Sequence, residues 1–136
     1  MTNEFIQAVI EDCTKKLELD PKDSEAYHNR GTAYLMQGNF DKAIQDSTKA
    51  IELNPNAFDT YTNRGTAYLM QGNFDKAIQD STKAIELDPD FGDPYYNRGF
   101  AYARQGNFDK AKKDINKCVE LNPDNKKAHE LLQLLR

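Results

Sequence analysis

The chain has 136 residues and a formal net charge of −4; 38% of its residues are hydrophobic and 29% are charged. This composition is typical of one soluble globular or repeat domain and excludes a fibrous or disordered chain. Its basic residues are scattered among acids, so we expect no nucleic-acid partner, because phosphate binding needs clustered Lys and Arg. No apolar stretch approaches the length that crosses a bilayer, so we expect no membrane association.

Residues 1–11 contain no basic region ahead of their apolar residues, so we expect no signal peptide. Cys13 and Cys118 are the only cysteines, and they are not spaced like metal ligands. We interpret both as small buried residues of a protein from a reducing compartment, which predicts a cytoplasmic location.

The first predicted element is a single helix within residues 1–23. Its apolar residues are Phe5, Ile6, Val9, Ile10, Cys13 and Leu17. The segment Glu11–Pro21 aligns with the second half of each unit that follows, so we predict that residues 1–23 are a half unit.

Residues 24–57 are predicted to form two helices, which we call the first-type and the second-type helix of a unit. The first-type helix has apolar or small residues on one face of a 3.6-residue period: Ala26, Tyr27, Ala33 and Tyr34. Gly38 supplies a left-handed cap, and Asn39 can cap the second-type helix. The second-type helix carries Phe40, Ala43, Ile44, Ala50, Ile51 and Leu53 and ends before Pro55.

This pair of helices recurs every 34 residues. Residues 29–53 and 63–87 are identical, and residues 97–121 are a looser third copy. We therefore predict full units at 24–57, 58–91 and 92–125. A single pair cannot cover its own apolar face, so neighbouring units must stack on it.

The tail, residues 126–136, aligns with a first-type helix alone, and we expect it to cap the stack. Its apolar residues are Ala128, Leu131, Leu132, Leu134 and Leu135. The leading helix lacks a first-type partner and the closing helix lacks a second-type partner. Head-to-tail stacking of chains into a weak homo-oligomer through these terminal helices is therefore the alternative to simple capping.

These units resemble the tetratricopeptide repeat (TPR) family. The family signature has aromatic residues at positions 4 and 11, Gly at 8, Ala at 20 and 27, and Pro at 32. In the unit that starts at Ser24 these are Tyr27, Tyr34, Gly31, Ala43, Ala50 and Pro55. In the unit from Phe58 they are Tyr61, Tyr68, Gly65, Ala77, Ala84 and Pro89. In the unit from Gly92 they are Tyr95, Tyr102, Gly99, Ala111, Cys118 and Pro123, with Cys118 replacing the second alanine.

The resemblance implies an all-α fold, namely a right-handed α-solenoid of stacked antiparallel helix pairs. Three full TPR units flanked by two half units give eight helices in one domain, residues 1–136.

Two positions depart from the family pattern. Position 7, usually Leu, is Arg30, Arg64 or Arg98, and position 24, usually a large apolar residue, is Ser47, Ser81 or Ile115. An arginine near the packing seam needs an acid, and position 23 supplies Asp46, Asp80 and Asp114, with Asp12 as the counterpart in the leading half unit. We predict structural Arg–Asp pairs within or between units, because an unpaired, partly buried guanidinium is costly. Ligand-binding arginines are the alternative.

In this family the first-type helices line a concave groove that binds ligands. The resemblance therefore predicts a peptide-binding groove whose candidate residues are His28, Asn29, Met36, Thr62, Asn63, Met70, Tyr96, Asn97, Phe100 and Arg104. The asparagines recur once per unit, and an amide can bracket a peptide group of an extended ligand. Bonding between neighbouring helices explains the asparagines equally well at this point. The methionines offer adaptable apolar surface or ordinary packing between units.

The family's clamp for acidic chaperone tails is not expected here. That clamp needs Lys, Asn, Asn, Lys and Arg where this chain has His28, Thr32, Asn63, Asp93 and Asn97. Only Asn63 matches, and Asp93 carries the wrong charge.

No catalytic set is visible in the sequence. His28 and His129 are the only histidines, neither has an i,i+4 partner suited to a metal, and each glycine stands alone at a repeat-defined place. We therefore expect no enzyme activity, no cofactor and no metal. The leading interpretation is a protein-interaction scaffold that holds a peptide or helix of a partner in its concave groove. The alternative is a self-assembling structural repeat protein.

Overall fold

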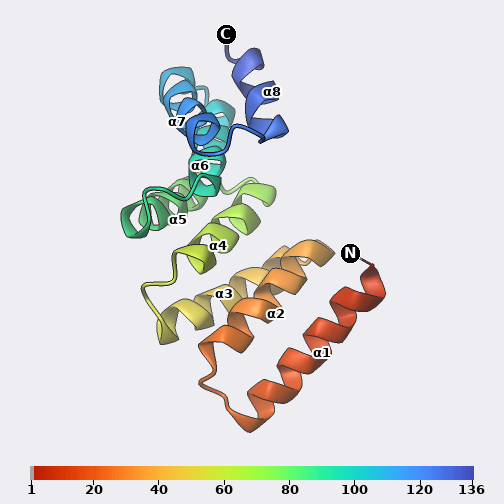
Figure 1. The fold of residues 1–136 in the computed structure, drawn as a ribbon. Helices are drawn as coiled ribbons and strands as arrows, with labels where there is room; N and C mark the ends of the chain where they lie inside the picture. Colours follow the sequence, from red (N-terminus) through yellow and green to blue (C-terminus); the bar gives the residue numbers. More distant parts are fainter. Residues whose placement is uncertain (1) are drawn as a thin grey trace.

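The computed structural model describes residues 2–136 as eight helices that alternate in direction (Figure 1). They are α1 (Asn3–Leu19), α2 (Ser24–Gln37), α3 (Phe40–Leu53), α4 (Phe58–Met70), α5 (Phe74–Leu87), α6 (Asp93–Arg104), α7 (Phe108–Leu121) and α8 (Lys126–Leu134). The even-numbered helices are the first type and the odd-numbered helices are the second type. The predicted all-α solenoid is confirmed, with α1 and α8 at opposite ends of the stack.

The turn inside each full unit has the predicted chemistry. Gly38, Gly72 and Gly106 have φ angles of 84°, 78° and 81°, so each adopts the left-handed conformation that ends the preceding helix. The next residue is Asn39, Asn73 or Asn107, and each side chain accepts a hydrogen bond from the backbone N–H three residues later. The sequence Gly-Asn thus reverses the chain in the same way three times.

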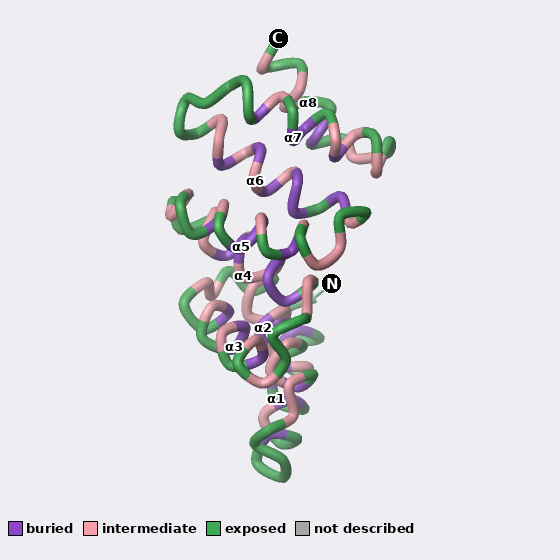
Figure 2. The backbone as a smooth tube through the Cα atoms, turned by 90° about the vertical axis from the view of Figure 1, so that its left-hand side faces the viewer, coloured by how far each residue is buried: buried purple, intermediate pink, exposed green. Residues whose placement is uncertain are grey.

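The core lies between the layer of first-type helices and the layer of second-type helices. Small residues allow the two layers to approach closely: Ala33, Ala67 and Ala101 on one side and Ala43, Ala77 and Ala111 on the other are all buried. Figure 2 shows the buried residues along this interface, while the exposed residues lie on the outer surfaces and at the two ends. No helix in the described part of the chain is long and apolar enough to span a membrane.

Aromatic residues at position 4 bind α4, α6 and α8 to the loops that precede them. The hydroxyl of Tyr61 donates to the carbonyl oxygen of Pro55 at 3.1 Å, and that of Tyr95 donates to Pro89 at 2.9 Å. In α8 this position is occupied by His129, whose Nε2 lies 2.7 Å from the Pro123 carbonyl oxygen. The second of the two histidines therefore has a structural role in place of a tyrosine.

Position 8 is where a first-type helix crosses its second-type partner most closely. A Cβ added to Gly65 would lie 3.4 Å from Ser81 Oγ, which is an ordinary contact. A Cβ added to Gly99 would lie 2.6 Å from Cδ1 of Ile115, and Ile115 is fully buried. The same glycine therefore has a different steric role in units two and three, because position 24 changes from Ser to Ile.

We predict that Gly65→Ala and Gly99→Ala change stability in opposite directions. Gly65→Ala raises helix propensity by about 1 kcal/mol without a clash, so its urea midpoint should stay level or rise. Gly99→Ala overpacks a buried contact and should lose about 1–3 kcal/mol. In the Ile115→Ser background, which carries the residue found in the other two units, the same Gly99→Ala change should cost little. Equal midpoints for the two single variants would contradict this steric account.

Candidate functional site

Each full unit contains one arginine that joins three helices. Arg64 on α4 donates to both carboxylate oxygens of Asp80 on α5, at 2.8 Å from Nε and 2.8 Å from Nη2. Its Nη1 donates to Thr48 Oγ1 on α3, the second-type helix of the preceding unit, at 3.1 Å. Equivalent contacts of 2.7–3.2 Å connect Arg30, Asp46 and Thr14, and also Arg98, Asp114 and Thr82. We call each set an Arg–Asp–Thr clasp.

The clasps confirm the predicted Arg–Asp pairs and show why these arginines are not ligand-binding groups. The Asp80 side chain is 5% exposed and that of Arg64 is 18% exposed. The hydrogen bonds that Arg64 donates to Asp80 raise the pKa of Arg64, and they outweigh desolvation, which lowers it. The guanidinium also lies within 6.0 Å of the ring centres of Tyr61 and Tyr68. Three of its five N–H groups therefore bind neighbouring helices within the stack.

Asp12, the counterpart of these acids in the leading half unit, has no arginine across from it among the described residues. It instead forms an ion pair with Lys16, one turn away on α1, at 3.2 Å. Both side chains are largely exposed.

The asparagines at position 6 form a second ladder, between consecutive first-type helices. Asn63 Nδ2 donates to Thr32 Oγ1 at 2.8 Å, and Asn97 Nδ2 donates to Thr66 Oγ1 at 2.9 Å. Asn97 is only 7% exposed. The structure therefore realises the inter-helix alternative for Asn63 and Asn97. Asn29 is exposed and has no hydrogen-bond partner among residues 2–136.

Two other candidate groove residues also make contacts within the stack of helices. Thr62, which the resemblance placed at the groove, is 5% exposed, and its hydroxyl donates to the Phe58 carbonyl oxygen. His28 is partly buried, with Nδ1 2.9 Å from Thr60 Oγ1 and Nε2 3.5 Å from an Asp59 carboxylate oxygen. These contacts join α2 to the start of α4.

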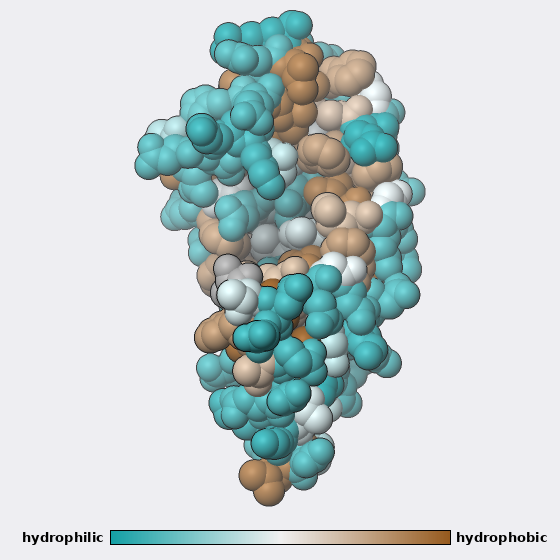
Figure 3. All heavy atoms as spheres, turned by 90° about the vertical axis from the view of Figure 1, so that its right-hand side faces the viewer, coloured by the Kyte–Doolittle hydropathy of each residue, from teal (hydrophilic) through white to brown (hydrophobic). Residues whose placement is uncertain are grey.

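The remaining candidates are largely exposed (Met36, Met70 and Arg104) or partly exposed (Tyr96 and Phe100). Met36 and Met70 are 51% and 61% exposed at position 13 of consecutive units. Arg104 occupies the same position in the third unit, and its guanidinium carbon lies 5.2 Å from the centre of the Phe74 ring. Tyr96 and Phe100 form a tilted pair with ring centres 6.1 Å apart. Figure 3 shows apolar atoms along this side of the molecule, from the C-terminal end toward the middle.

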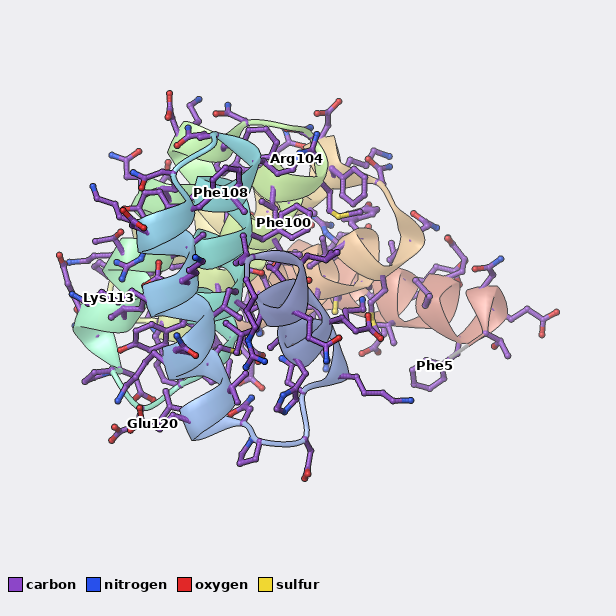
Figure 4. The ribbon with its side chains drawn as sticks, turned by 90° about the horizontal axis from the view of Figure 1, so that it is seen from above. Phe5, Phe100, Arg104, Phe108, Lys113 and Glu120 are labelled. Carbon is purple, nitrogen blue, oxygen red and sulfur yellow. The ribbon has the colours of Figure 1, made fainter. Side chains whose placement is uncertain are left out.

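Phe108 is an exposed aromatic residue that was not among the candidates. It is 54% exposed and is the first residue of α7 (Figure 4). Its counterparts Phe40 and Phe74 are only partly exposed, and the guanidinium of Arg104 on the next first-type helix lies over the Phe74 ring. The local sequence Asn-Phe-Asp-Lys is the same at all three places, so nothing in the sequence distinguishes Phe108.

The two cysteines are buried, as predicted. Burial raises the pKa of Cys118 to about 11, so its thiol is protonated near neutral pH. Burial likewise raises the pKa of Tyr96 and of Asp93 at the start of α6. Among the described residues, no group of three or more His, Cys, Asp and Glu is arranged to hold a metal ion.

Stacked helix pairs of 34 residues with these ladders define the class as an α-helical repeat solenoid. Residues 24–57 and 93–125 match the tetratricopeptide repeat family, and two further TPR models match residues 48–79 and 65–106. The TPR domain of Arabidopsis OM64 is 33% identical, with a TM-score of 0.81 over 83% of this chain and 93% of that domain. The chain belongs to the tetratricopeptide repeat family.

Two further solved structures show the same arrangement. MamA is 28% identical with a TM-score of 0.85, and the match covers 93% of this chain and 74% of that one. The first TPR domain of Spaghetti (RPAP3), bound to the HSP90 peptide SRMEEVD, is 30% identical with a TM-score of 0.79, over 82% of this chain and 91% of that one. Among curated proteins, no sequence matches the chain significantly.

We predict that Asp80→Ala lowers the free energy of unfolding by about 3 kcal/mol, because it leaves the partly buried Arg64 guanidinium unpaired. Thr48→Val removes one arm of the clasp and should cost only about 1 kcal/mol. The double variant Arg64→Leu with Asp80→Ala removes both charges and should recover most of the loss. Urea titration followed by circular dichroism measures all three. Equal losses for Asp80→Ala and Thr48→Val would contradict the central place of the ion pair.

Proposed function

We propose that this protein is an interaction module that binds a peptide or helix of a partner protein in the groove lined by α2, α4 and α6. The observation that carries the proposal is the exposed row Met36, Met70 and Arg104, next to the aromatic pair Tyr96 and Phe100. Methionine adapts to different apolar shapes, and aromatic residues and Arg are enriched at protein interfaces. This set offers apolar anchoring together with one accessible positive charge.

Solved relatives support a peptide ligand in general terms. The first TPR domain of Spaghetti is described with an HSP90 peptide, and the second TPR domain of human RPAP3, 29% identical, with an HSP70 peptide. The ligand of the present protein should differ from those acidic tails. Asp93 occupies a place where the clamp for acidic tails has Lys, and an acid there repels carboxylates.

Specificity should come mainly from the third unit and the first. Units one and two share residues 29–53 and 63–87 without a change, so they present nearly equivalent surfaces. Asn63 and Asn97 are engaged between helices, which leaves Asn29 as the accessible amide of the ladder. We propose that Tyr96, Phe100 and Arg104 select the ligand, and that Met36 and Met70 contribute adaptable contact area.

Self-assembly through the terminal helices is the alternative, and two substitutions at the ends weigh against it. Gln133 stands in α8 at position 8, where the full units have Gly for close approach. Lys16 stands in α1 at position 27, where α3 and α5 have the buried Ala50 and Ala84. A pairing of α8 with α1 of another chain would place these two long polar side chains in the closest part of the contact.

The groove proposal predicts loss of partner capture when the aromatic pair is removed. The double variant Tyr96→Ala with Phe100→Ala should reduce affinity at least about 100-fold, because buried aromatic anchors carry much of the energy of such interfaces. Leu19→Ala, at an 89% exposed position on α1, is the matched control and should bind like the parent chain.

The measurement is affinity capture from cell extract with the three chains, followed by calorimetric titration of the captured protein. Thermal melts should show that each variant remains folded. Capture of the same partner at unchanged affinity by the double variant would refute the groove assignment.

A further inference from the structure

The two layers of the solenoid end at different points at the N-terminal end. The second-type layer includes α1, but among the described residues no first-type helix lies beside it. A hollow of about 400 Å³ lies between α1 and α2 at this end of the stack. Its floor on α1 includes Phe5, Val9 and Asp12, and its wall on α2 includes Asn29 and Met36. Phe5 is 54% exposed and lies at the outer end of α1 (Figure 4).

Within the stack, three consecutive residues of a first-type helix contact its neighbouring helices at the position that corresponds to the hollow. In α2 they are Arg30, Gly31 and Thr32, and the same triplet recurs in α4. The arginine pairs with the aspartate of the second-type helix, as Arg30 does with Asp46 at 2.7 and 2.8 Å. The glycine allows close approach, since its Cβ would lie 3.2 Å from Ser47 Oγ. The threonine accepts the hydrogen bond of the next asparagine, here Asn63 at 2.8 Å.

The hollow contains side chains that can pair with the first and last residues of that triplet. Asp12 occupies the place that Asp46 has in the first full unit, and Asn29 occupies the place that Asn63 has in the second. The Asp12 carboxylate is held only by the exposed Lys16, and the Asn29 amide has no partner among residues 2–136. The series of Arg–Asp pairs and the series of Asn–Thr hydrogen bonds therefore both reach this face. There they end at Asp12 and Asn29, which are exposed to solvent.

We propose that this hollow is a docking site for an amphipathic helix of a partner protein in which a basic residue, a small residue and a Ser or Thr follow one another. The helix lies parallel to α2. Its basic residue pairs with Asp12, its small residue faces α1, and its hydroxyl accepts from Asn29. Apolar residues on the same face cover Phe5, Val9 and Met36. The hollow shares Asn29 and Met36 with the groove but does not include the aromatic pair Tyr96 and Phe100, so the inference goes beyond the proposed function.

A second copy of this chain does not supply the matching helix. The one first-type helix that lacks a second-type partner within the described residues is α8, and its triplet is Leu132, Gln133 and Leu134. Leucine cannot pair with Asp12, glutamine cannot approach as closely as glycine, and Leu134 cannot accept a hydrogen bond from Asn29. The side-chain chemistry of the hollow therefore does not match the closing helix of a second copy.

Lys16 acts as the competitor for the incoming basic residue. It replaces an alanine found in α3 and α5, and it occupies the Asp12 carboxylate at 3.2 Å. That hydrogen bond favours the charged form of Lys16 and raises its pKa. Replacing Lys16 by alanine frees Asp12 and opens space in the hollow, and it should strengthen binding, whereas most interface truncations weaken it.

The test uses the whole 136-residue chain and a hydrocarbon-stapled peptide with the sequence of residues 24–37, which contains the Arg-Gly-Thr triplet. Fluorescence anisotropy should show saturable binding of one peptide per chain. Asn29→Ala and Asp12→Asn should each weaken binding about fivefold, as expected for one hydrogen bond or one exposed ion pair. Lys16→Ala should tighten binding about threefold, and Tyr96→Ala, a groove variant, should leave it unchanged.

A double-mutant cycle identifies the contact. A peptide carrying Thr32→Val should bind the parent chain about fivefold more weakly, with no further loss against Asn29→Ala. The inference is overturned if the peptide does not bind, if Asn29→Ala has no effect, or if a stapled peptide of residues 126–136 binds equally well, which would assign the hollow to a second copy. Loss of this site with retained capture by the groove would leave the proposed function intact.

Discussion

The Arg–Asp–Thr clasp is the interaction on which the arrangement of the units depends. Each arginine belongs to the first-type helix of its unit and donates to both carboxylate oxygens of an aspartate on the second-type helix. It also donates to a threonine hydroxyl on the preceding second-type helix. One side chain thus sets the spacing within a unit and the rotation between units. Its planar, bidentate geometry permits little variation in either. The resembled family usually places Leu at this position, so the present chain uses a polar seam where others use apolar packing.

This polar seam also restricts which residues can meet a ligand. The clasp arginines and two of the three ladder asparagines are engaged between helices, so the chain's most regular features are structural. Of the groove candidates that keep some exposed surface, Tyr96, Phe100 and Arg104 differ from their counterparts in the other units, whereas Met36 and Met70 are equivalent. Because residues 29–53 and 63–87 are identical, the chain gains selectivity only where this repetition is broken. The breaks lie in the third unit, at the start of each first-type helix and at the two ends.

Much of the fold follows from short-range patterns in the sequence. Gly38 and Asn39 predict a helix reversal by local chemistry, and Arg30 and Asp46 predict an ion pair because both lie on the packing faces of one helix pair. The third arm of the clasp, Thr14, could not be predicted in the same way, because it depends on how one unit rotates against the next. The same applies to the burial of Thr62 and Asn97. Whether Asn63 faced a ligand or Thr32 was likewise decided by the distance between α2 and α4, which periodicity does not give.

The account is tested most directly by proton exchange at the five arginine side chains, measured by correlation of ¹H and ¹⁵Nε signals in the intact chain. Arg30, Arg64 and Arg98 each donate an Nε–H to a buried carboxylate, whereas Arg104 and Arg136 lie at exposed positions. We expect three Nε–H signals that exchange slowly with water and two that exchange rapidly. Rapid exchange at all five arginines would contradict the clasp as the interaction that holds the units together.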